Sequence, residues 1–425
     1  MKKILITGAN FNNKGAQSML FITVNEIRNH FSDAEIFFTT WENLPEFNNL
    51  TFQPVFYNEE AMRIALNSKK TYCILFTRLL KNVVKKAMKK EIVEIKRFYE
   101  LKELIQDITL IVDISGYNLG SKWGVAGSEN FLNYIRLAKL YEIPMVVMPQ
   151  SFGPFDYNEK DKGILEEIKE LLPYPLKIYA REWEGYRLLT DKFLLKNVEK
   201  SADIVLQNTG IDLSNIYKTI PQIKSLNINT IHNVAVIPNQ QCVIHGNYSV
   251  LINTYKKIIQ LLLKSEKDVY VFRHAGEDLK LCIDIKNLFE SNVNVHLIDY
   301  DFSCLEFDQF IKNFEFSVCS RFHAIVHAYR NGIPCIVLGW ALKYKELTEA
   351  VAQGQFCFDI LNSTDESGIM NAVREMCSAP ELQSKIISEY LYSIRKENCF
   401  DIFTLKETMR PSGCINEEIE AKISE

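Results

Sequence analysis

The chain has 425 residues, of which 47% are hydrophobic and 24% are charged, and its formal net charge is −4. This length allows two or three domains around a large buried core, and the slightly acidic balance argues against general nucleic-acid binding, which needs a basic surface. No apolar run approaches the roughly 20 residues that cross a bilayer, and the start of the chain has no secretory signal.

Short apolar runs alternate with helical patterns along most of the chain. The runs are continuously apolar, which is typical of parallel strands covered by helices on both faces. We predict strands at 3–7, 34–40, 109–115, 144–149, 176–181, 233–238, 268–274, 294–299, 314–320 and 334–339. The pattern predicts an α/β protein with two Rossmann-like parallel-sheet domains that share a crevice at the carboxyl ends of their strands.

The polar stretch 215–232 is the predicted linker between these domains. We expect a first domain at 1–220, a second at 221–385, and a helical tail at 386–425 that can return to brace the first domain. Ten cysteines without a C-x-x-C pair are typical of reduced, buried thiols, so we expect a cytoplasmic protein.

The first loop, "GANFNNKGAQ", is neither of the glycine patterns that bind nucleotides. Its Asn10, Asn13 and Gln17 carry neutral hydrogen-bonding groups that suit sugar hydroxyls, although turn-forming asparagines without a ligand explain the loop equally well. Trp123 can stack on a sugar face or belong to the core.

Residues 68–98 combine apolar residues at helical spacing with a lysine-rich face. A basic amphipathic helix can lie on an anionic membrane, so 77–98 is a candidate for peripheral contact with the inner face of the cell membrane. The alternative is a helix whose apolar face packs on the core and whose lysine-rich face is exposed to solvent.

The stretch "SRFHAIVHAYRNGIPCIVLGW" (320–340) follows a predicted strand. Ser320 is the predicted N-cap of a helix that ends at Asn331-Gly332. Arg321 and His323 then lie in the first turn, where unpaired N–H groups and an arginine fork favour an anion. The alternative to an anion site is an ordinary βαβ crossover helix, with Arg321 at the surface and His323 at the edge of the core. His323 and His327 lack the glutamate and third ligand of a zinc motif, so we expect no metal.

This stretch resembles the polysaccharide pyruvyl transferase family, whose signature is a strand, Ser-x-Arg-x-His or a close variant, a helix, Gly-x-Pro, and a strand leading to a lysine. The runs "ILITGANFNNKGAQSML", "LIVDISGYNLGSKWG", "VVMPQSFGPF" and "IYAREWEGYRLL" resemble the family's other motifs in the same order. Ser115-Gly116-Tyr117 is less glycine-rich than is usual, and Trp340-Ala341-Leu342 replaces the common Tyr-Asp-x before Lys343.

The resemblance implies a GT-B-like fold. It also implies an enzyme that transfers pyruvate from phosphoenolpyruvate to a glycan or lipid-linked glycan, where it forms a ketal, without a cofactor. It implies that Arg321 and Arg181 hold the donor and that His323 protonates it. The other expected site residues are Ser320, Lys343 and His274 around the donor, and Asp113 as general base or as a helix cap. A nucleotide-sugar glycosyltransferase and a non-catalytic glycan-binding protein remain alternatives.

Overall fold

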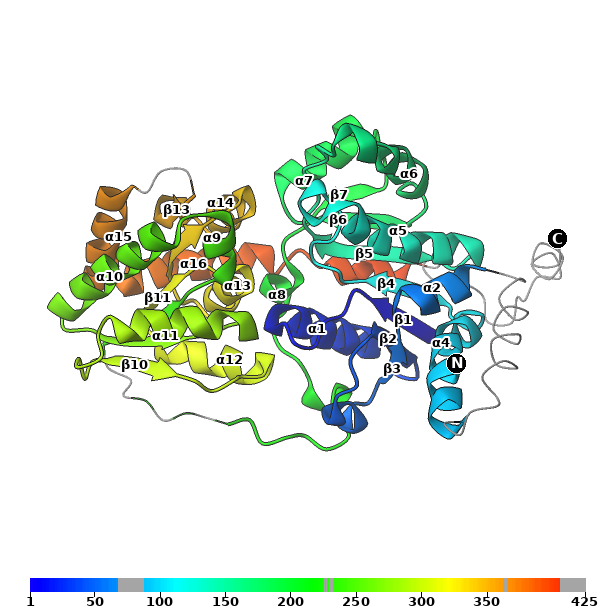
Figure 1. Cartoon of the computed structure of the whole chain (residues 1–425), viewed down its shortest axis with the longest axis horizontal. Helices are drawn as coiled ribbons and strands as arrows, with labels where there is room; N and C mark the ends of the chain where they lie inside the picture. Colours follow the sequence, from blue (N-terminus) through cyan, green and yellow to red (C-terminus); the bar gives the residue numbers. More distant parts are fainter. Residues whose placement is uncertain (68–87, 225, 227, 229–231, 362–364, 406–425) are drawn as a thin grey trace.

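The computed structural model describes residues 1–67, 88–224, 226, 228, 232–361 and 365–405. Figure 1 shows two α/β lobes side by side, with the N-terminal half of the chain in one and most of the C-terminal half in the other. Each lobe is built on one parallel sheet, as the continuous apolar runs predicted.

The two sheets have the same Rossmann order. In the first lobe it is β3-β2-β1-β4-β5-β6-β7, and in the second it is β10-β9-β8-β11-β12-β13. The strands of the first sheet are β1 (Lys3–Thr7), β2 (Glu35–Thr40), β3 (Gln53–Phe56), β4 (Leu110–Asp113), β5 (Met145–Gln150), β6 (Lys177–Ala180) and β7 (Val198–Lys200). Those of the second are β8 (Asn233–Ile237), β9 (Asp268–Phe272), β10 (Val295–Ile298), β11 (Phe316–Cys319), β12 (Cys335–Gly339) and β13 (Cys357–Asp359).

All ten predicted strands are confirmed, and the sheets contain three further strands, β3, β7 and β13. The boundary that we predicted near residue 220 falls between β7 and β8, the last strand of the first sheet and the first of the second.

Helices cover both faces of each sheet (Figure 1). In the first lobe they are α1 (Lys14–His30), α2 (Glu59–Leu66), α4 (Met88–Ile105), α5 (Gly124–Leu140), α6 (Gly163–Leu171), α7 (Trp183–Arg187) with a π-helical turn at Leu188–Lys192, and α8 (Ile204–Gln207). In the second they are α9 (Gln240–His245), α10 (Tyr248–Lys264), α11 (Leu279–Asn287), α12 (Cys304–Phe310), α13 (Phe322–Arg330), α14 (Leu342–Glu349), α15 (Glu366–Ser378) and α16 (Pro380–Ile394).

The lobes share one hydrophobic cluster, which runs from Ile4 of the first sheet to Tyr329 of α13. Helices α1 and α8 of the first lobe pack on α12 and α13 of the second. This burial holds the lobes together on the α1 side of the interface.

The C-terminal segment crosses between the lobes. Helix α16 begins at Pro380, before the predicted start of the tail at 386, and packs on α8. The following turn, Cys399–Thr404, reaches α1, where Phe403 packs edge-on against His30 at 5.7 Å between ring centroids. Figure 1 shows this orange-to-red end passing behind the lobes.

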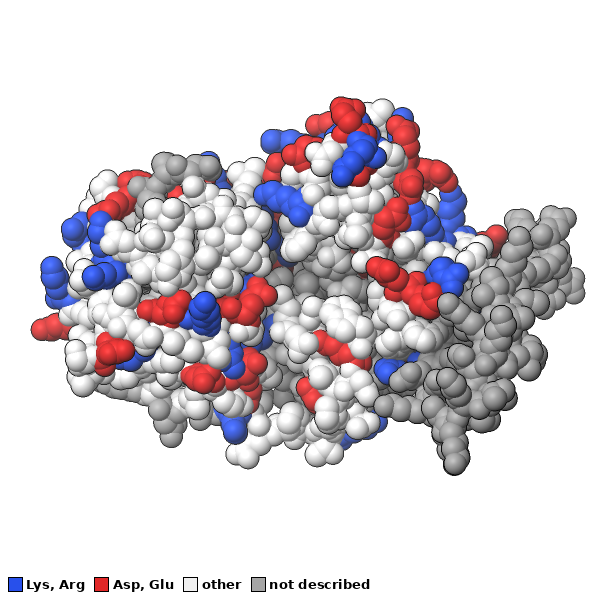
Figure 2. All heavy atoms as spheres, in the orientation of Figure 1, with Lys and Arg blue, Asp and Glu red and all other residues white. Residues whose placement is uncertain are grey.

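The first half of the predicted membrane-contact segment 77–98 lies outside the described residues, which resume with α4 at Met88. Within the described ranges, no helix has the length and apolar character to span a bilayer. Figure 2 shows acidic and basic side chains interspersed over both lobes, so the described part of this face has no continuous basic surface.

Candidate functional site

A cavity of about 700 Å³ lies where the two sheets face each other. The strand order reverses between β1 and β4 in one sheet and between β8 and β11 in the other. Ligands of such sheets bind beside this reversal, at the carboxyl ends of the strands. The cavity is lined by residues that follow all four strands: Asn10, Ser115, Asn239 and Arg321. The shared crevice that the sequence predicted is therefore present.

Arg321 lies at the N-terminus of α13 and lines the cavity. Its Nε donates to Asp278 Oδ2 at 2.7 Å, its Nη2 donates to Asp278 Oδ1 at 2.6 Å, and Nη2 also pairs with Glu277. Burial alone would lower the pKa of Arg321, but Asp278 and then Glu277 raise it above its ordinary value. The guanidinium is therefore charged and held in place, with part of its surface left open to the cavity.

His323 lies in the first turn of α13 and also lines the cavity. Its Nε2 is buried and has no hydrogen-bond partner among the described residues; Asp203 Oδ2 lies 3.9 Å away. Burial lowers the pKa of His323 well below its usual value, and the nearby positive charge of Arg181 lowers it further. The imidazole is therefore neutral near pH 7 in the free protein.

Helix α1 begins directly against the His323 ring. A Cβ added to Gly15 would lie 2.0 Å from His323 Cγ and 2.2 Å from its Nδ1, so only glycine allows this approach. The N-termini of α1 and α13, from different lobes, thus meet at this histidine. No described side chain caps the first N–H groups of α13, whereas Asn13 caps the Gly15 and Ala16 N–H groups of α1. Both helices direct the positive ends of their dipoles towards this histidine.

Arg181 brings a second guanidinium to the cavity from the first lobe, directly after β6. Its Nη1 donates to Asp203 Oδ2 at 2.9 Å and its Nε to Glu182 Oε1 at 3.0 Å. The guanidinium carbon lies 4.2 Å from the centre of the Phe322 ring, which belongs to the second lobe. Arg181 and Arg321 therefore approach one end of the cavity from opposite domains.

Lys343, on the first turn of α14, completes this cationic end. Its Nζ lies between 5.0 and 5.8 Å from the ring centroids of Tyr117, Phe322, Trp340 and Tyr344. Burial lowers the pKa of Lys343 to about 7, and the charge of Arg181 acts in the same direction. Lys343 is therefore present in both protonation states near neutral pH, and its charge depends on what binds beside it.

His274 follows β9 and lines the same cavity. Its ring packs edge-on against Phe307 at 4.8 Å, and its buried Nε2 has no partner among the described residues. Burial, followed by the positive charge of Lys14, lowers the pKa of His274 well below its usual value. It offers the cavity a neutral ring.

Ser320 is placed differently from the prediction. The N-cap position of α13 is Arg321 rather than Ser320. Ser320 is fully buried: its hydroxyl pairs with the Tyr255 hydroxyl at 2.7 Å and its carbonyl accepts from Asn239 Nδ2 at 2.8 Å. The Ser320 N–H still donates to the Ile237 carbonyl of β8, so the extended pairing continues one residue past the end of β11 and directs the Ser320 side chain away from the cavity. Ser320 thus supports the loop that carries Arg321 and does not line the cavity.

Gln17 also lies away from the cavity. It is on the second turn of α1, where its side-chain oxygen accepts a hydrogen bond from the Cys304 N–H at 2.8 Å. This bond joins α1 to the start of α12 across the lobe interface. Gln17 is therefore an interdomain contact rather than a sugar-binding residue.

Asp113 is completely buried at the end of β4 and does not line the cavity. Its carboxylate accepts hydrogen bonds from the Thr7 hydroxyl at 2.8 Å, from the Ser115 N–H and hydroxyl at 3.1 and 2.9 Å, and from Gln150 Nε2 at 3.2 Å. Burial raises the pKa of Asp113 in spite of these donors. These contacts make Asp113 an anchor for the loop after β4, and the next described α-helix, α5, begins only at Gly124 and is not capped by it.

Asn10, Asn13 and Trp123 do line the cavity. Asn13 is the N-cap of α1 and accepts from the Gly15 N–H at 3.0 Å, while Asn10 accepts from the Asn12 and Asn13 N–H groups. Both side-chain oxygens therefore hold the loop, which leaves the amide nitrogens for a ligand. Trp123 is half exposed and packs edge-on against Tyr117 at 5.6 Å.

Several lining residues were not predicted. They are Glu277 beside Arg321, and an aromatic and amide group in the first lobe made of Trp41, Tyr57, Asn130 and Tyr134. Trp41 directly follows the end of β2. Because ligands of parallel sheets bind at the carboxyl ends of the strands, this position could have been identified from the sequence. The other three belong to a short edge region and to α5, where no local signal distinguishes them from core residues.

The second histidine of α13 points away from the first. His327 Nε2 pairs with the Ser18 hydroxyl at 2.9 Å and His327 Nδ1 pairs with Asp308 Oδ1 at 2.9 Å. These buried contacts join α1, α12 and α13. His327 thus belongs to the permanent side of the lobe interface, and it does not share a ligand with His323.

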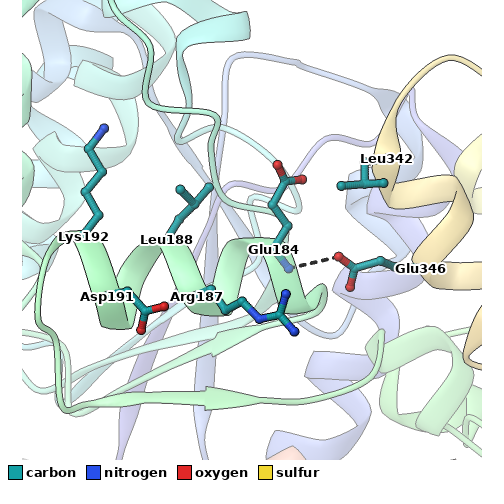
Figure 3. Close-up of a pocket in the computed structure, with 7 residues that line it drawn as sticks. All are labelled: Glu184, Arg187, Leu188, Asp191, Lys192, Leu342 and Glu346. Carbon is teal, nitrogen blue, oxygen red and sulfur yellow. Dashed lines mark hydrogen bonds between the residues drawn. The ribbon is translucent and has the colours of Figure 1, made fainter.

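The opposite side of the interface is exposed and carries one charged contact. Glu346 of α14 accepts hydrogen bonds from the N–H groups of Trp183 and Glu184, the first residues of α7; the second measures 3.0 Å. Figure 3 shows this bond and the small surface pocket around it, lined by both lobes. Glu346 lies one turn after Lys343, and Trp183 lies two residues after Arg181, so the contact ties two cationic residues of the cavity together.

Comparisons with known proteins agree with this architecture. A family model described as polysaccharide pyruvyl transferase matches residues 13–341. No curated protein sequence matches the chain significantly. Among solved structures, the S. aureus MnaA–UDP complex shows 12% identity over 91% of each chain, with a TM-score of 0.54.

Two further structures share this level of similarity. The UDP-GlcNAc 2-epimerase from Methanocaldococcus jannaschii is 14% identical over 92% of this chain and 100% of its own, with a TM-score of 0.54. A structure of S. aureus TarM is 10% identical over 96% and 99% of the two chains, also at 0.54. At such identities the likeness concerns the fold alone, and it confirms the GT-B-like arrangement.

Proposed function

The chain belongs to the polysaccharide pyruvyl transferase family, and on this premise we propose that it transfers pyruvate from phosphoenolpyruvate to a sugar of a surface polysaccharide or its lipid-linked precursor. The product is a cyclic pyruvate ketal, and no metal or organic cofactor takes part. One observation carries the proposal: Arg181 and Arg321, from opposite lobes, meet His323 and Lys343 at one end of a single cavity.

The donor has a carboxylate and a phosphate close together, and this end of the cavity suits such a compact polyanion. Guanidinium groups bind both anions in fork geometry. The first N–H groups of α13, which no described side chain caps, add further donors, and the dipole of α1 adds positive potential. Each arginine is already oriented by carboxylates, so binding costs little side-chain entropy. Lys343 and His323, whose pKa values are lowered in the free protein, gain protons as the donor binds and balance its charge.

Protonated His323 is then placed to give its proton to the methylene carbon of the donor. This step makes C2 electrophilic, and one sugar hydroxyl adds there after losing its proton. A second hydroxyl displaces phosphate from C2 and closes the ketal, so two C–O bonds form and one C–O bond to phosphate breaks. One of the two hydroxyl protons replaces the proton delivered to carbon, and the other leaves with phosphate. His323 is neutral once it has given its proton to carbon, and it can then accept the proton of a sugar hydroxyl.

The test is donor binding and turnover in matched variants. We expect calorimetry to detect phosphoenolpyruvate binding, and we expect one phosphate to be released for each ketal seen by mass spectrometry. Because Arg321→Ala would leave buried Asp278 unpaired, Arg321→Lys is the better variant. It keeps a charge but loses the fork, and should lower kcat/KM by about 100-fold (~2.7 kcal/mol). Arg374→Ala, on an exposed face of α15, is the control.

The alternatives give different results in the same assays. A glycosyltransferase would bind a uridine diphosphate sugar and ignore phosphoenolpyruvate. A non-catalytic glycan-binding protein would bind glycans equally well with and without the Arg321 fork. Normal turnover by Arg321→Lys and by His323→Gln would contradict the assignment of the donor site.

A further inference from the structure

The cavity extends from the cationic end into the first lobe, where its lining changes character. Thr39, Trp41, Tyr57, Asn130 and Tyr134 line this region, which we call the aromatic chamber. Even if each non-hydrogen atom of phosphoenolpyruvate occupied the roughly 30 Å³ of a liquid water, the donor would take only about 300 Å³. More than half of the ~700 Å³ cavity remains for another ligand.

Two tryptophans border the cavity with much of their surface exposed. Trp41 is 57% exposed and Trp123 is 51% exposed. Tryptophan is highly buried on average, so two half-exposed indoles on one cavity indicate surfaces that a ligand covers. The C–H-bearing face of a pyranose is apolar and fits the electron-rich face of an indole, while its hydroxyls stay free for hydrogen bonds.

The floor of the chamber is a chain of neutral polar groups. The Thr39 hydroxyl pairs with the Tyr134 hydroxyl at 3.1 Å, the Tyr57 and Tyr134 rings lie 5.1 Å apart, and the Tyr57 hydroxyl donates to Asn130 Oδ1 at 3.4 Å. This arrangement leaves the Asn130 amide nitrogen to donate to a ligand. Hydroxyl and amide groups at the edge of an aromatic surface are the usual partners of sugar hydroxyls.

The charge of the cavity is unevenly divided. The Lys and Arg residues among its described lining are Arg181, Arg321 and Lys343, and all three lie at the donor end. Next to Trp41, the Glu42 carboxylate is already occupied by the Phe11 N–H at 3.2 Å and by the Asn12 amide. A carboxylate or phosphate bound in the chamber would lose hydration without gaining a counter-charge, which is costly. The chamber therefore favours an uncharged ring.

One loop connects the chamber to the donor end. Asn12 contacts Glu42 beside Trp41, and the adjacent Asn13 caps α1, whose Gly15 touches His323. A ring in the chamber can therefore lie next to the carbon that His323 protonates.

We propose that the aromatic chamber is the acceptor subsite and that it takes a neutral sugar ring, which stacks on Trp41 and hydrogen-bonds to Asn130. The inference rests on the proposed pyruvyl transfer, which it deepens by naming the acceptor class. It predicts that a uronic acid is rejected at this position.

The probes are p-nitrophenyl β-D-glucoside and p-nitrophenyl β-D-galactoside and their glucuronide and galacturonide counterparts, which differ only by a carboxylate at C6. Binding to the full chain is followed by calorimetry, with and without phosphoenolpyruvate. We expect each neutral glycoside to bind at least about tenfold more tightly than its uronide. Trp41→Ala should weaken neutral glycoside binding at least about tenfold and leave phosphoenolpyruvate binding unchanged.

Trp183→Ala is the matched control, because Trp183 is 53% exposed in the same lobe but does not line the cavity. It should bind every probe as the parent protein does. Asn130→Lys, which adds a cation to the chamber, should reverse the preference towards the uronides, and it supplies an independent test if Trp41→Ala fails to fold.

The proposal is overturned if no neutral glycoside binds, if the uronides bind as tightly as the neutral pair, or if Trp41→Ala and Trp183→Ala behave alike. Failure of the transfer reaction itself is recognised separately: the parent protein would then not bind phosphoenolpyruvate, whereas glycoside binding in its absence would still report on the chamber.

Discussion

Replacing Gly15 by alanine should abolish activity without unfolding the protein. The new Cβ would lie 2.0 Å from His323 Cγ, whereas non-bonded carbons sit at about 3.5–4.0 Å, so the imidazole must shift by about 1.5 Å. A misplacement of about 1 Å costs on the order of 100-fold in rate, so we expect kcat to fall at least 100-fold. Alanine improves helix propensity by about 1 kcal/mol, which partly offsets an overpacking cost of about 1–3 kcal/mol. Tm should therefore change by only a few degrees.

Steady-state release of phosphate measures this effect, and thermal unfolding measures stability. Gly163→Ala is the matched control: Gly163 is the first residue of α6, and a Cβ there meets nothing within 4 Å. It should retain full activity. If Gly15→Ala turned over like the parent protein, His323 could not be the group whose position governs the reaction.

Three further results are expected. Donor affinity should rise as the pH falls, because Lys343 and His323 take up protons in the complex, and Lys343, with a pKa of about 7, should contribute up to tenfold per pH unit above pH 7; calorimetry in buffers of different ionisation enthalpy would detect the proton uptake, and Lys343→Arg should weaken this pH dependence. Glu346→Ala should raise the KM for phosphoenolpyruvate about tenfold by releasing α7 from α14, whereas Glu349→Ala on the same helix should not; equal KM values would contradict the role of this contact. Asp113→Asn should lower the free energy of unfolding by about 1–3 kcal/mol, since an amide cannot accept all four donors, but should leave the pH profile of kcat unchanged; denaturant titration and a pH–rate series would show whether Asp113 is instead a base.

The sequence predicted the strands well where both faces are buried and poorly at the sheet edges. The three strands that were not predicted, β3, β7 and β13, are all edge strands of three or four residues. Edge strands are short, are covered less completely and tolerate residues such as Pro54. They therefore lack the continuous apolar signal of the central strands.

Site residues were predicted best where they follow a central strand. Arg181 follows β6, and Arg321 and His323 follow β11, so the topology alone brings them to one crevice. Ser320, next to Arg321, and Asp113, the last residue of β4, point into the interior instead, as does Gln17 of α1. A shift of one residue at the end of a strand turns a side chain from the cavity to the core, and the sequence does not fix where a strand ends.

What the sequence determined by itself is the fold class, the positions of ten strands along the chain, and the cationic residues at the carboxyl ends of several of them, because hydrophobic periodicity and strand polarity are local properties. Only the tertiary structure decided how these residues are charged and what surrounds them. Burial lowers the pKa of Lys343 to about 7, because Tyr117 and Phe322, from two other segments, pack around it together with its own neighbours Trp340 and Tyr344. The aromatic chamber exists because β2, the region after β3, and α5 converge on the loop after β1. Burial and electrostatic coupling depend on distances between segments far apart in the chain, and those distances arise only when the two lobes pack.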